Sequence, residues 1–186
     1  MFEKNIVRVY DVAYFDGVFY CLCDSGILAA YNISEKELRF VTHTEFISSR
    51  DRLLMGYRMI ESDGELLLVC VDQVACEADS SLGYCSVYTF DWSPDVMTWV
   101  PKTCLGNRAL FISRNSSFSI SAPHISNRVY FHDFNNTTKF YSLNDDQFHV
   151  CHTFEFRGVV GGELNNNDNN KTRPVTLWIQ TPQFST

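Results

Sequence analysis

Three stretches of this sequence repeat the same succession of strand-like segments, and this repeat limits the fold more than any other feature. Each stretch has a turn and an apolar run, then a segment with a central tyrosine, then a more polar segment. The tyrosines are Tyr31, Tyr88 and Tyr141, so successive repeats are 57 and 53 residues apart. A fourth strand-like segment precedes each repeat, at residues 9–15, 57–61 and 109–112. Four strands at a period near 50 are typical of the blades of a kelch-like β-propeller.

The apolar runs in these repeats indicate how the sheets are covered. Residues 18–22 and 66–71 are apolar at nearly every position, whereas a strand with one face in water alternates apolar and polar residues. Convincing helical periodicity is almost absent, and residues 44–55 could form at most one short helix. Neighbouring blades of a propeller would cover both faces of such strands. A β-sandwich with irregular patterning is the alternative.

We therefore predict an all-β fold, a partial kelch-like β-propeller of about three four-stranded antiparallel blades that form part of a larger ring. The blades are expected at about residues 8–42, 55–101 and 107–152. Propeller rings usually contain about 4–8 blades, so three blades leave two faces to be covered. An Asn-rich loop at 165–170 precedes a last strand at 174–180, which could complete the first blade or cap the third. Self-association through the open blade edges would also cover them.

Composition and charge exclude several classes of protein. The 186 residues include 15 Lys and Arg and 22 Asp and Glu, a net charge of −7 without any basic run, so we expect no nucleic-acid partner. The longest apolar stretch, residues 66–71, is far shorter than the roughly 20 residues that span a membrane. The first residues resemble neither a secretory signal nor a transit peptide, and the seven cysteines show no repeated spacing. We expect a protein of the cytoplasm and/or the nucleus, without membrane contact.

The residue patterns of known catalytic and metal sites are missing. Cys21 and Cys23 share one strand face, and His149, Cys151 and His152 offer three more ligands, but neither group has the paired spacing of a zinc site. A nucleophile elbow, a Gly-rich phosphate loop and an H-E-x-x-H motif are all lacking. We therefore predict no catalytic residue, no metal and no cofactor. A kelch-like propeller enzyme is the less favoured alternative.

Three arginines in predicted loops are the candidates for binding a protein partner: Arg50, Arg52 and Arg114. Arginine is favoured at interfaces because its planar guanidinium forms paired hydrogen bonds and stacks on rings. The loops that could carry such contacts are residues 48–53, 73–83 and 113–117. Ordinary solvated surface arginines are the alternative interpretation.

One long segment resembles a known family. Residues 99–111 read WVPKTCLGNRALF, residues 117–122 read SFSISA and residues 127–133 read NRVYFHD. Residues 14–20 (YFDGVFY) and 176–179 (TLWI) extend the likeness to most of the chain. In this order the segments resemble the plant F-box-associated, KIB-type β-propeller family, also called domain of unknown function 295, which is kelch-like in architecture.

The resemblance implies structural roles for the residues of its motifs. These residues are Gly17, Leu105, Gly106, Arg108, Ala109, Leu110, Phe111, Tyr130 and Phe131. We expect Gly106 to permit a turn that enters the blade. Arg108 is expected to brace that turn through hydrogen bonds to backbone carbonyls.

The resemblance also implies a function, a non-enzymatic propeller that binds protein. In F-box-containing members an N-terminal F-box docks on the Skp-type adaptor of a ubiquitin ligase, and the propeller presents the substrate. The Leu-Pro-x-Asp stretch of an F-box is absent before Asp16, so docking on that adaptor is not expected here. The expected partner is a protein of unknown identity. The other alternative is a truncated, poorly folding copy of a longer propeller protein.

Overall fold

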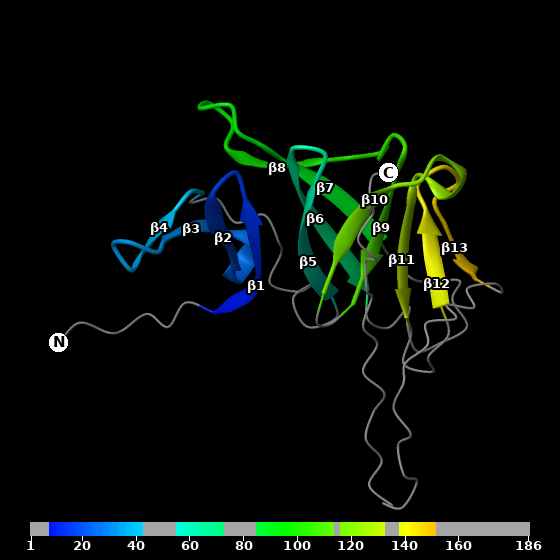
Figure 1. The fold of residues 1–186 in the computed structure, drawn as a ribbon, viewed down its shortest axis with the longest axis horizontal. Helices are drawn as coiled ribbons and strands as arrows, with labels where there is room; N and C mark the ends of the chain where they lie inside the picture. The colour runs from blue at the N-terminus through cyan, green and yellow to red at the C-terminus, as the bar shows by residue number, and fades with distance from the viewer. Residues whose placement is uncertain (1–7, 43–54, 73–84, 114–115, 133–137, 152–186) are drawn as a thin grey trace, which may run out of the picture.

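The computed structural model describes residues 8–42, 55–72, 85–113, 116–132 and 138–151, which form three successive β-sheets (Figure 1). We call these sheets the first, second and third blades. The first blade contains β1 (Val9–Phe15), β2 (Val18–Cys23), β3 (Leu28–Asn32) and β4 (Glu37–Phe40). The second contains β5 (Met55–Ser62), β6 (Glu65–Asp72), β7 (Cys85–Asp91) and β8 (Thr98–Pro101). The third contains β9 (Arg108–Ile112), β10 (Phe118–Ser121), β11 (Arg128–His132), β12 (Thr138–Ser142) and β13 (Gln147–Val150).

Two-residue turns join the first two strands of the first and second blades. Asp16 and Gly17 connect β1 to β2 with φ of 46° and 81°, and Asp63 and Gly64 connect β5 to β6 with φ of 56° and 76°. Positive φ at both positions gives a turn whose twist matches that of the flanking strands, which is why Asp-Gly is favoured there. The turns set the register, so that Phe15 pairs with Val18 and Ser62 with Glu65.

The third blade departs from the predicted four antiparallel strands. Its strand order is β10-β9-β11-β12-β13, and β11 runs parallel to β9. The hairpin of β9 and β10 adds a strand at the edge of the sheet. The chain then passes through the short 3₁₀ turn Pro123–Ile125 and returns on the other side of β9. A parallel pair needs such a crossover, because a tight hairpin can join only antiparallel strands.

The strand β6 shows how the blades pack, since successive side chains of a strand point to opposite faces. Leu66 and Leu68 belong to an apolar cluster that includes Leu22 and Leu28 of the first blade. Leu67, which lies between them, belongs to a second cluster shared with the third blade, as do Val69 and Val71. Each blade therefore covers a face of the next. This packing explains the unbroken apolar run and confirms the predicted partial propeller over the predicted alternative of a sandwich.

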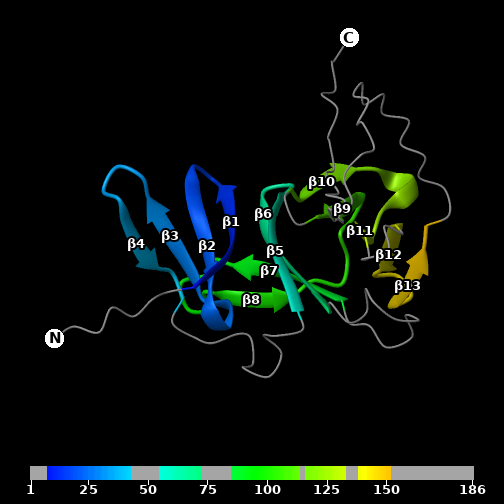
Figure 2. The same ribbon diagram turned by 90° about the horizontal axis from the view of Figure 1, so that it is seen from below.

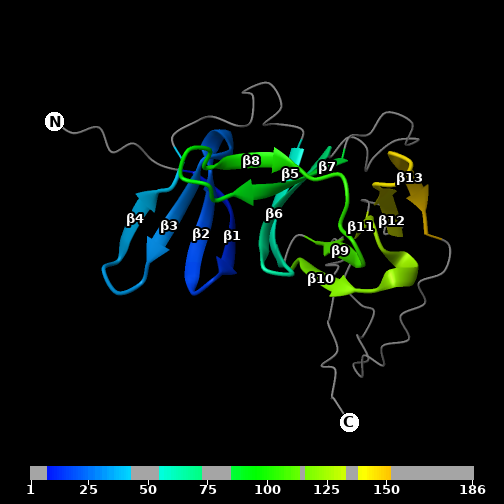
Figure 3. The same ribbon diagram turned by 90° about the horizontal axis from the view of Figure 1, so that it is seen from above.

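The blades fan out from one side of the molecule. Strand β5 contacts both β1 and β10, and these three strands are the first in the order of their sheets. The last strands in these orders are β4, β8 and β13, and Figures 2 and 3, which view the molecule along the vertical axis of Figure 1, show β4 and β13 at opposite ends of the molecule. In the described part of the chain the ring is not closed.

Aromatic side chains fill the contact between the first and second blades. The rings of Phe15 and Trp92 stack with centroids 5.8 Å apart, and Phe90 meets Trp99 edge to face at 5.1 Å. Trp99 also donates a hydrogen bond of 3.1 Å from its indole Nε1 to the carbonyl of Gly26 in the first blade. Because the indole is buried, this bond satisfies its N–H while the ring packs.

The outer faces of the first and third blades are also apolar. On the first blade Cys21 and Ala29 are buried, whereas Val12 and Tyr14 on the same face are 50% and 59% exposed. On the third blade Phe111 stacks on Tyr130 with ring centroids 4.8 Å apart.

No helix in the described ranges is long and apolar enough to cross a membrane.

Several predicted features lie outside the described residues. They are the candidate helix up to residue 54, the loops 48–53 and 73–83, the Asn-rich loop 165–170 and the last strand 174–180. Met55, the final residue of the candidate helix, is the first residue of β5.

A candidate binding pocket where three blades meet

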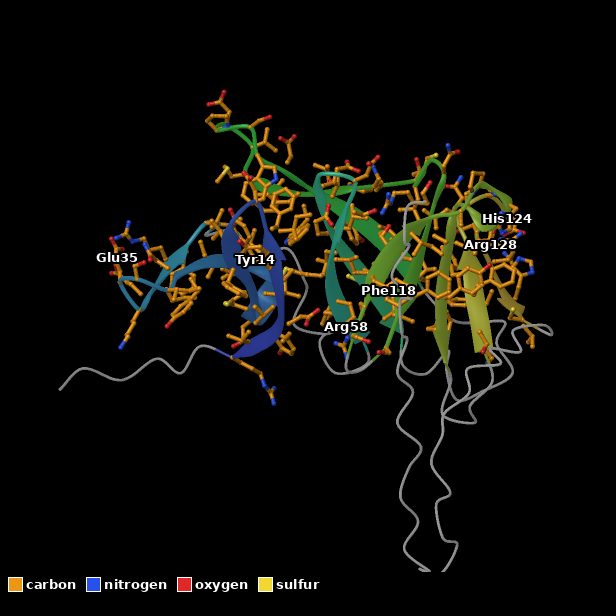
Figure 4. The ribbon with its side chains drawn as sticks, viewed as in Figure 1. Tyr14, Glu35, Arg58, Phe118, His124 and Arg128 are labelled. Carbon is orange, nitrogen blue, oxygen red and sulfur yellow. The ribbon has the colours of Figure 1, made fainter. Side chains whose placement is uncertain are left out.

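A pocket of about 250 Å³ lies at the place where β1, β5 and the β9–β10 connection meet. Figure 4, which has the same view as Figure 1, shows Arg58 near the lower end of β5. The first two strands supply charged and apolar groups, and the connection supplies hydroxyls. The lining residues are Asp11, Val12, Arg58, Met59, Ser113, Ser116 and Ser117. The pocket therefore draws on segments that are far apart in the sequence.

Asp11 joins the first blade to the second. One carboxylate oxygen accepts the backbone N–H of Met59 at 2.7 Å, and the other accepts the N–H of Val12 at 3.0 Å. Burial raises the pKa of the Asp11 carboxyl above its ordinary value, and these N–H groups and the positive charge of Arg58 oppose the rise. Both oxygens are thus engaged with backbone groups.

Arg58 joins the second blade to the third. Its Nε donates to the carbonyl of Ser113 at 2.9 Å, and its Nη1 donates to the carbonyl of Tyr57 at 2.6 Å. Arg58 and Ile60 lie two residues apart on one face of β5, and Ile60 packs in the cluster shared with the third blade. The two carbonyls hold the guanidinium at the pocket.

The serines of the β9–β10 connection form a bonded turn. Ser113 Oγ donates to the carbonyl of Ser116 at 2.6 Å and accepts the N–H of Ser116 at 2.9 Å. The N–H of Ser113 reaches Ser117 Oγ at 3.4 Å. These bonds fix the wall that the third blade contributes.

The sequence pattern predicts one wall of this pocket and not the other two. The predicted binding loop 113–117 contains Ser113, Ser116 and Ser117. Arg50, Arg52 and Arg114 lie outside the described residues. Asp11 and Arg58 stand inside predicted strands, where a polar residue usually marks a solvent-facing side. The available signal was a charged residue beside apolar neighbours, as in the sequence Tyr57-Arg58-Met59.

A comparison with protein-family models decides the family. The model described as the KIB1-4 beta-propeller matches residues 2–165, most of the chain. This chain belongs to the KIB-type β-propeller family. No match was found among curated proteins. The resemblance of the sequence motifs and the stacked blades of the structure agree with this membership.

Most of the KIB-type motif residues lie in the interior. Apart from the two glycines and Arg108, all of them are buried: Leu105, Ala109, Leu110, Phe111, Tyr130 and Phe131. Gly106 has a φ of +62° in the turn that leads into β9, and Gly17 has +81° in the first hairpin. Only glycine adopts such φ values without steric cost, which accounts for the presence of glycine at these turns.

Arg108 differs from the expected brace in its partner. Its Nε donates to the hydroxyl of Ser119 at 2.7 Å and not to a backbone carbonyl. Ser119 Oγ lies 2.7 Å from Ser62 Oγ of the second blade, so the three side chains link the blades. The turn itself is held by Asn127, whose Oδ1 accepts the N–H of Leu105 at 2.6 Å. Carbonyls of this turn accept backbone N–H groups, as in the bonds from the N–H of Arg108 to the carbonyl of Leu105 and from the N–H of Ala122 to the carbonyl of Asn107.

Of the candidate metal ligands, His152 lies outside the described residues, and the others occupy ordinary positions. Cys21 and Cys23 are buried in the first blade, and burial raises the pKa of the Cys23 thiol to about 11. The imidazole Nε2 of His149 lies 2.9 Å from an Asp145 oxygen at the surface. Among the described residues, no three His, Cys, Asp or Glu side chains gather as a metal site.

Proposed function

We propose that this KIB-type propeller is a non-enzymatic protein-interaction module that binds its partner at the pocket between the three blades. The observation that carries the proposal is the pocket's construction: side chains from three blades converge on one polar recess at the inner strands. Stacked blades form a rigid scaffold, and connections at their ends can vary without disturbing it. Such a site positions contacts accurately for a partner.

The proposal covers only the binding half of the role that F-box-containing relatives perform. In those relatives the propeller presents a protein substrate to a ubiquitin ligase, and a separate F-box docks on the adaptor. The support for substrate presentation here is family membership, to which the pocket adds a place for the contact. Adaptor docking is not part of the proposal.

A peptide selection tests the function. The full chain would be immobilised and screened with a phage-displayed library of peptides from disordered regions. We expect enrichment of related peptides whose affinity falls at least about tenfold in Arg58→Ala, because an arginine that anchors an interface contributes about 2 kcal/mol or more. Arg39→Ala is the matched control, since Arg39 lies on β4 and, among the described residues, forms its ion pairs with exposed Glu35 and Glu37.

A second variant separates binding from folding. Ser117→Ala removes one hydroxyl from the pocket wall and leaves the guanidinium of Arg58 in place. Circular dichroism of each variant would establish that the β-sheets persist. Failure to enrich any peptide family, or equal binding by wild type, Arg58→Ala and Ser117→Ala, would contradict the proposal.

A further inference from the structure

The hydrogen bonds of Arg58 leave part of its guanidinium available. Nε and Nη1 donate to the carbonyls of Ser113 and Tyr57. Within the described part of the chain, Nη2 donates to no protein acceptor. A guanidinium carries five N–H groups, so the two bonds fix its plane and leave donors to face the pocket. The group is pre-organised because its backbone partners already restrict its rotamers.

Ser117 adds a second donor to the same recess. Its Oγ accepts the N–H of Ser113, and an oxygen that accepts in this way keeps its own O–H hydrogen for another acceptor. The hydroxyl of Ser113 is directed instead to the carbonyl of Ser116. Arg58 and Ser117 are thus two donors that reach the pocket from different blades.

Two carboxylate oxygens and two backbone carbonyls at the pocket already accept hydrogen bonds. Both oxygens of Asp11 accept backbone N–H groups, from Met59 and from Val12. The carbonyls of Ser113 and Ser116 accept from Arg58 and from the Ser113 hydroxyl. With these four acceptors engaged, the donors of Arg58 and Ser117 favour a ligand group rich in acceptors.

We propose that the pocket binds a carboxylate of the partner peptide through Arg58 Nη2 and the Ser117 hydroxyl. This inference rests on the proposed function and names the chemistry that the site recognises. Charge-assisted bonds from a guanidinium to a carboxylate are among the strongest hydrogen bonds in proteins. The volume of about 250 Å³ lies below the range of whole small-molecule sites, about 300–1,000 Å³, and suits one side chain or a chain terminus.

A carboxylate fits this pocket better than a phosphate. Both groups are acceptors, but a phosphate carries a charge of about −1.5 to −2 at neutral pH. Among the described residues that line the pocket there is one cation, Arg58, and one carboxyl, Asp11. Asp11 repels a singly charged carboxylate less than it repels a phosphate, and one negative charge is enough to pair with Arg58. We expect acidic side chains or a peptide C-terminus, with phosphopeptides disfavoured.

A pair of isosteric probes tests this inference on the full chain. N-acetyl-glutamate α-amide carries the side-chain carboxylate, and N-acetyl-glutamine α-amide replaces it with a neutral carboxamide. Each would be titrated while the amide NMR signals of Met59 and Ser117 are followed. We expect saturable shifts with the glutamate probe and at least about tenfold weaker binding of the glutamine probe, since one charge-assisted contact is replaced.

Further arms identify the source of the carboxylate and the groups that bind it. Tighter binding of N-acetylglycine would assign a peptide C-terminus, and tighter binding of the glutamate probe an acidic side chain; either supports the inference. Arg58→Lys and Ser117→Ala should each weaken the preferred probe several-fold, whereas Arg39→Ala should bind it as the wild type does.

Three results would overturn the carboxylate assignment. They are equal affinity for the glutamate and glutamine probes, the absence of saturable shifts at the pocket amides, and tighter binding of N-acetyl-phosphoserine amide. None of them bears on the peptide selection. Peptides without acidic groups that still require Arg58 would leave the proposed function intact while removing this inference.

Discussion

At the scale of single residues, Asp11 shows how one polar side chain both joins two blades and makes stability depend on pH. Burial raises the pKa of its carboxyl from 3.8, although the Met59 and Val12 N–H groups and the charge of Arg58 oppose the rise. Between 3.8 and the raised value the folded protein binds the proton more tightly than the unfolded chain does. The free energy of unfolding contributed by Asp11 should therefore fall as pH rises through this window.

The variant Asp11→Asn should remove this contribution, because the amide does not titrate. Urea unfolding of wild type and variant at intervals from pH 3.5 to 7 would give the difference between their unfolding free energies. We expect that difference to change in favour of the wild type as the pH is lowered. The comparison cancels other groups, such as Asp91, whose pKa is lowered by its bonds to Ser93. A difference independent of pH would contradict the assignment.

The hydrogen bond that Arg108 donates predicts that removing this side chain lowers the stability of the fold. Arg108→Ala should lower the free energy of unfolding by about 1–2 kcal/mol, because the bond to Ser119 is lost and the link to Ser62 is left incomplete. Arg39→Ala should leave the free energy of unfolding nearly unchanged, since exposed ion pairs contribute little. Thermal or urea unfolding measures both. An unchanged midpoint for Arg108→Ala would exclude its bracing role.

Cys104 is expected to be more reactive than the buried thiols. The Gly106 N–H and the Asn127 side chain, with the charge of Lys102, lower the pKa of this exposed thiol. Burial raises the pKa of Cys21, of Cys23 to about 11 and of Cys70 to about 12. Because the thiolate is the nucleophile, iodoacetamide at pH 7.5 should label Cys104 first among these four. Peptide mass spectrometry over time would show the order, and earlier labelling of Cys70 would refute it.

At the scale of the elements, β6 distinguishes a propeller blade from a half-exposed sheet. Leu67 and Leu68 are both fully buried, although they point toward different neighbouring blades. Leu67→Ala and Leu68→Ala should therefore each lower the free energy of unfolding by about 2–5 kcal/mol, the usual range for a buried leucine. In a sheet with one face in water, one of two adjacent substitutions would be nearly neutral. Urea unfolding decides, and a neutral result for either variant would contradict the stacking.

The strands show how far a pattern of residues determines an element. The apolar and aromatic run of β1 was predicted at residues 9–15, where the structure places it. The strand β10 was not predicted, because Phe118–Ser121 is short and polar at alternate positions. Its pairing with β9, and the parallel pairing of β9 with β11, depend on which side of β9 the returning chain enters. That choice is made by packing between sheets and leaves no local periodicity.

The pocket shows the same limit for a site. Its serine wall could be predicted from the sequence, because turn residues in a loop indicate an accessible segment. Asp11 and Arg58 could not be predicted as site residues, because each becomes part of a pocket only when β1, β5 and the β9–β10 connection come together. Their roles follow from contacts across 48 and 55 residues of sequence, from Asp11 to Met59 and from Arg58 to Ser113.

At the scale of the whole molecule, the shared cores and the pocket have a common origin. Each apolar cluster between blades is built from two sheets, so the inner strands β1, β5 and β10 are held side by side. The polar groups at their ends are thereby brought to one place. The three-blade stack is therefore the unit that makes a binding site.

Hydrogen–deuterium exchange on the full chain, free and bound to the peptide enriched by selection, tests this account most directly. We predict that binding slows exchange together in residues 8–15, 55–62 and 116–121, which contain β1, β5 and β10 and meet at the pocket. Exchange in the outer strands β4 and β8 should not change. Slower exchange confined to those outer strands, or to one of the three inner segments alone, would contradict a site shared by three blades.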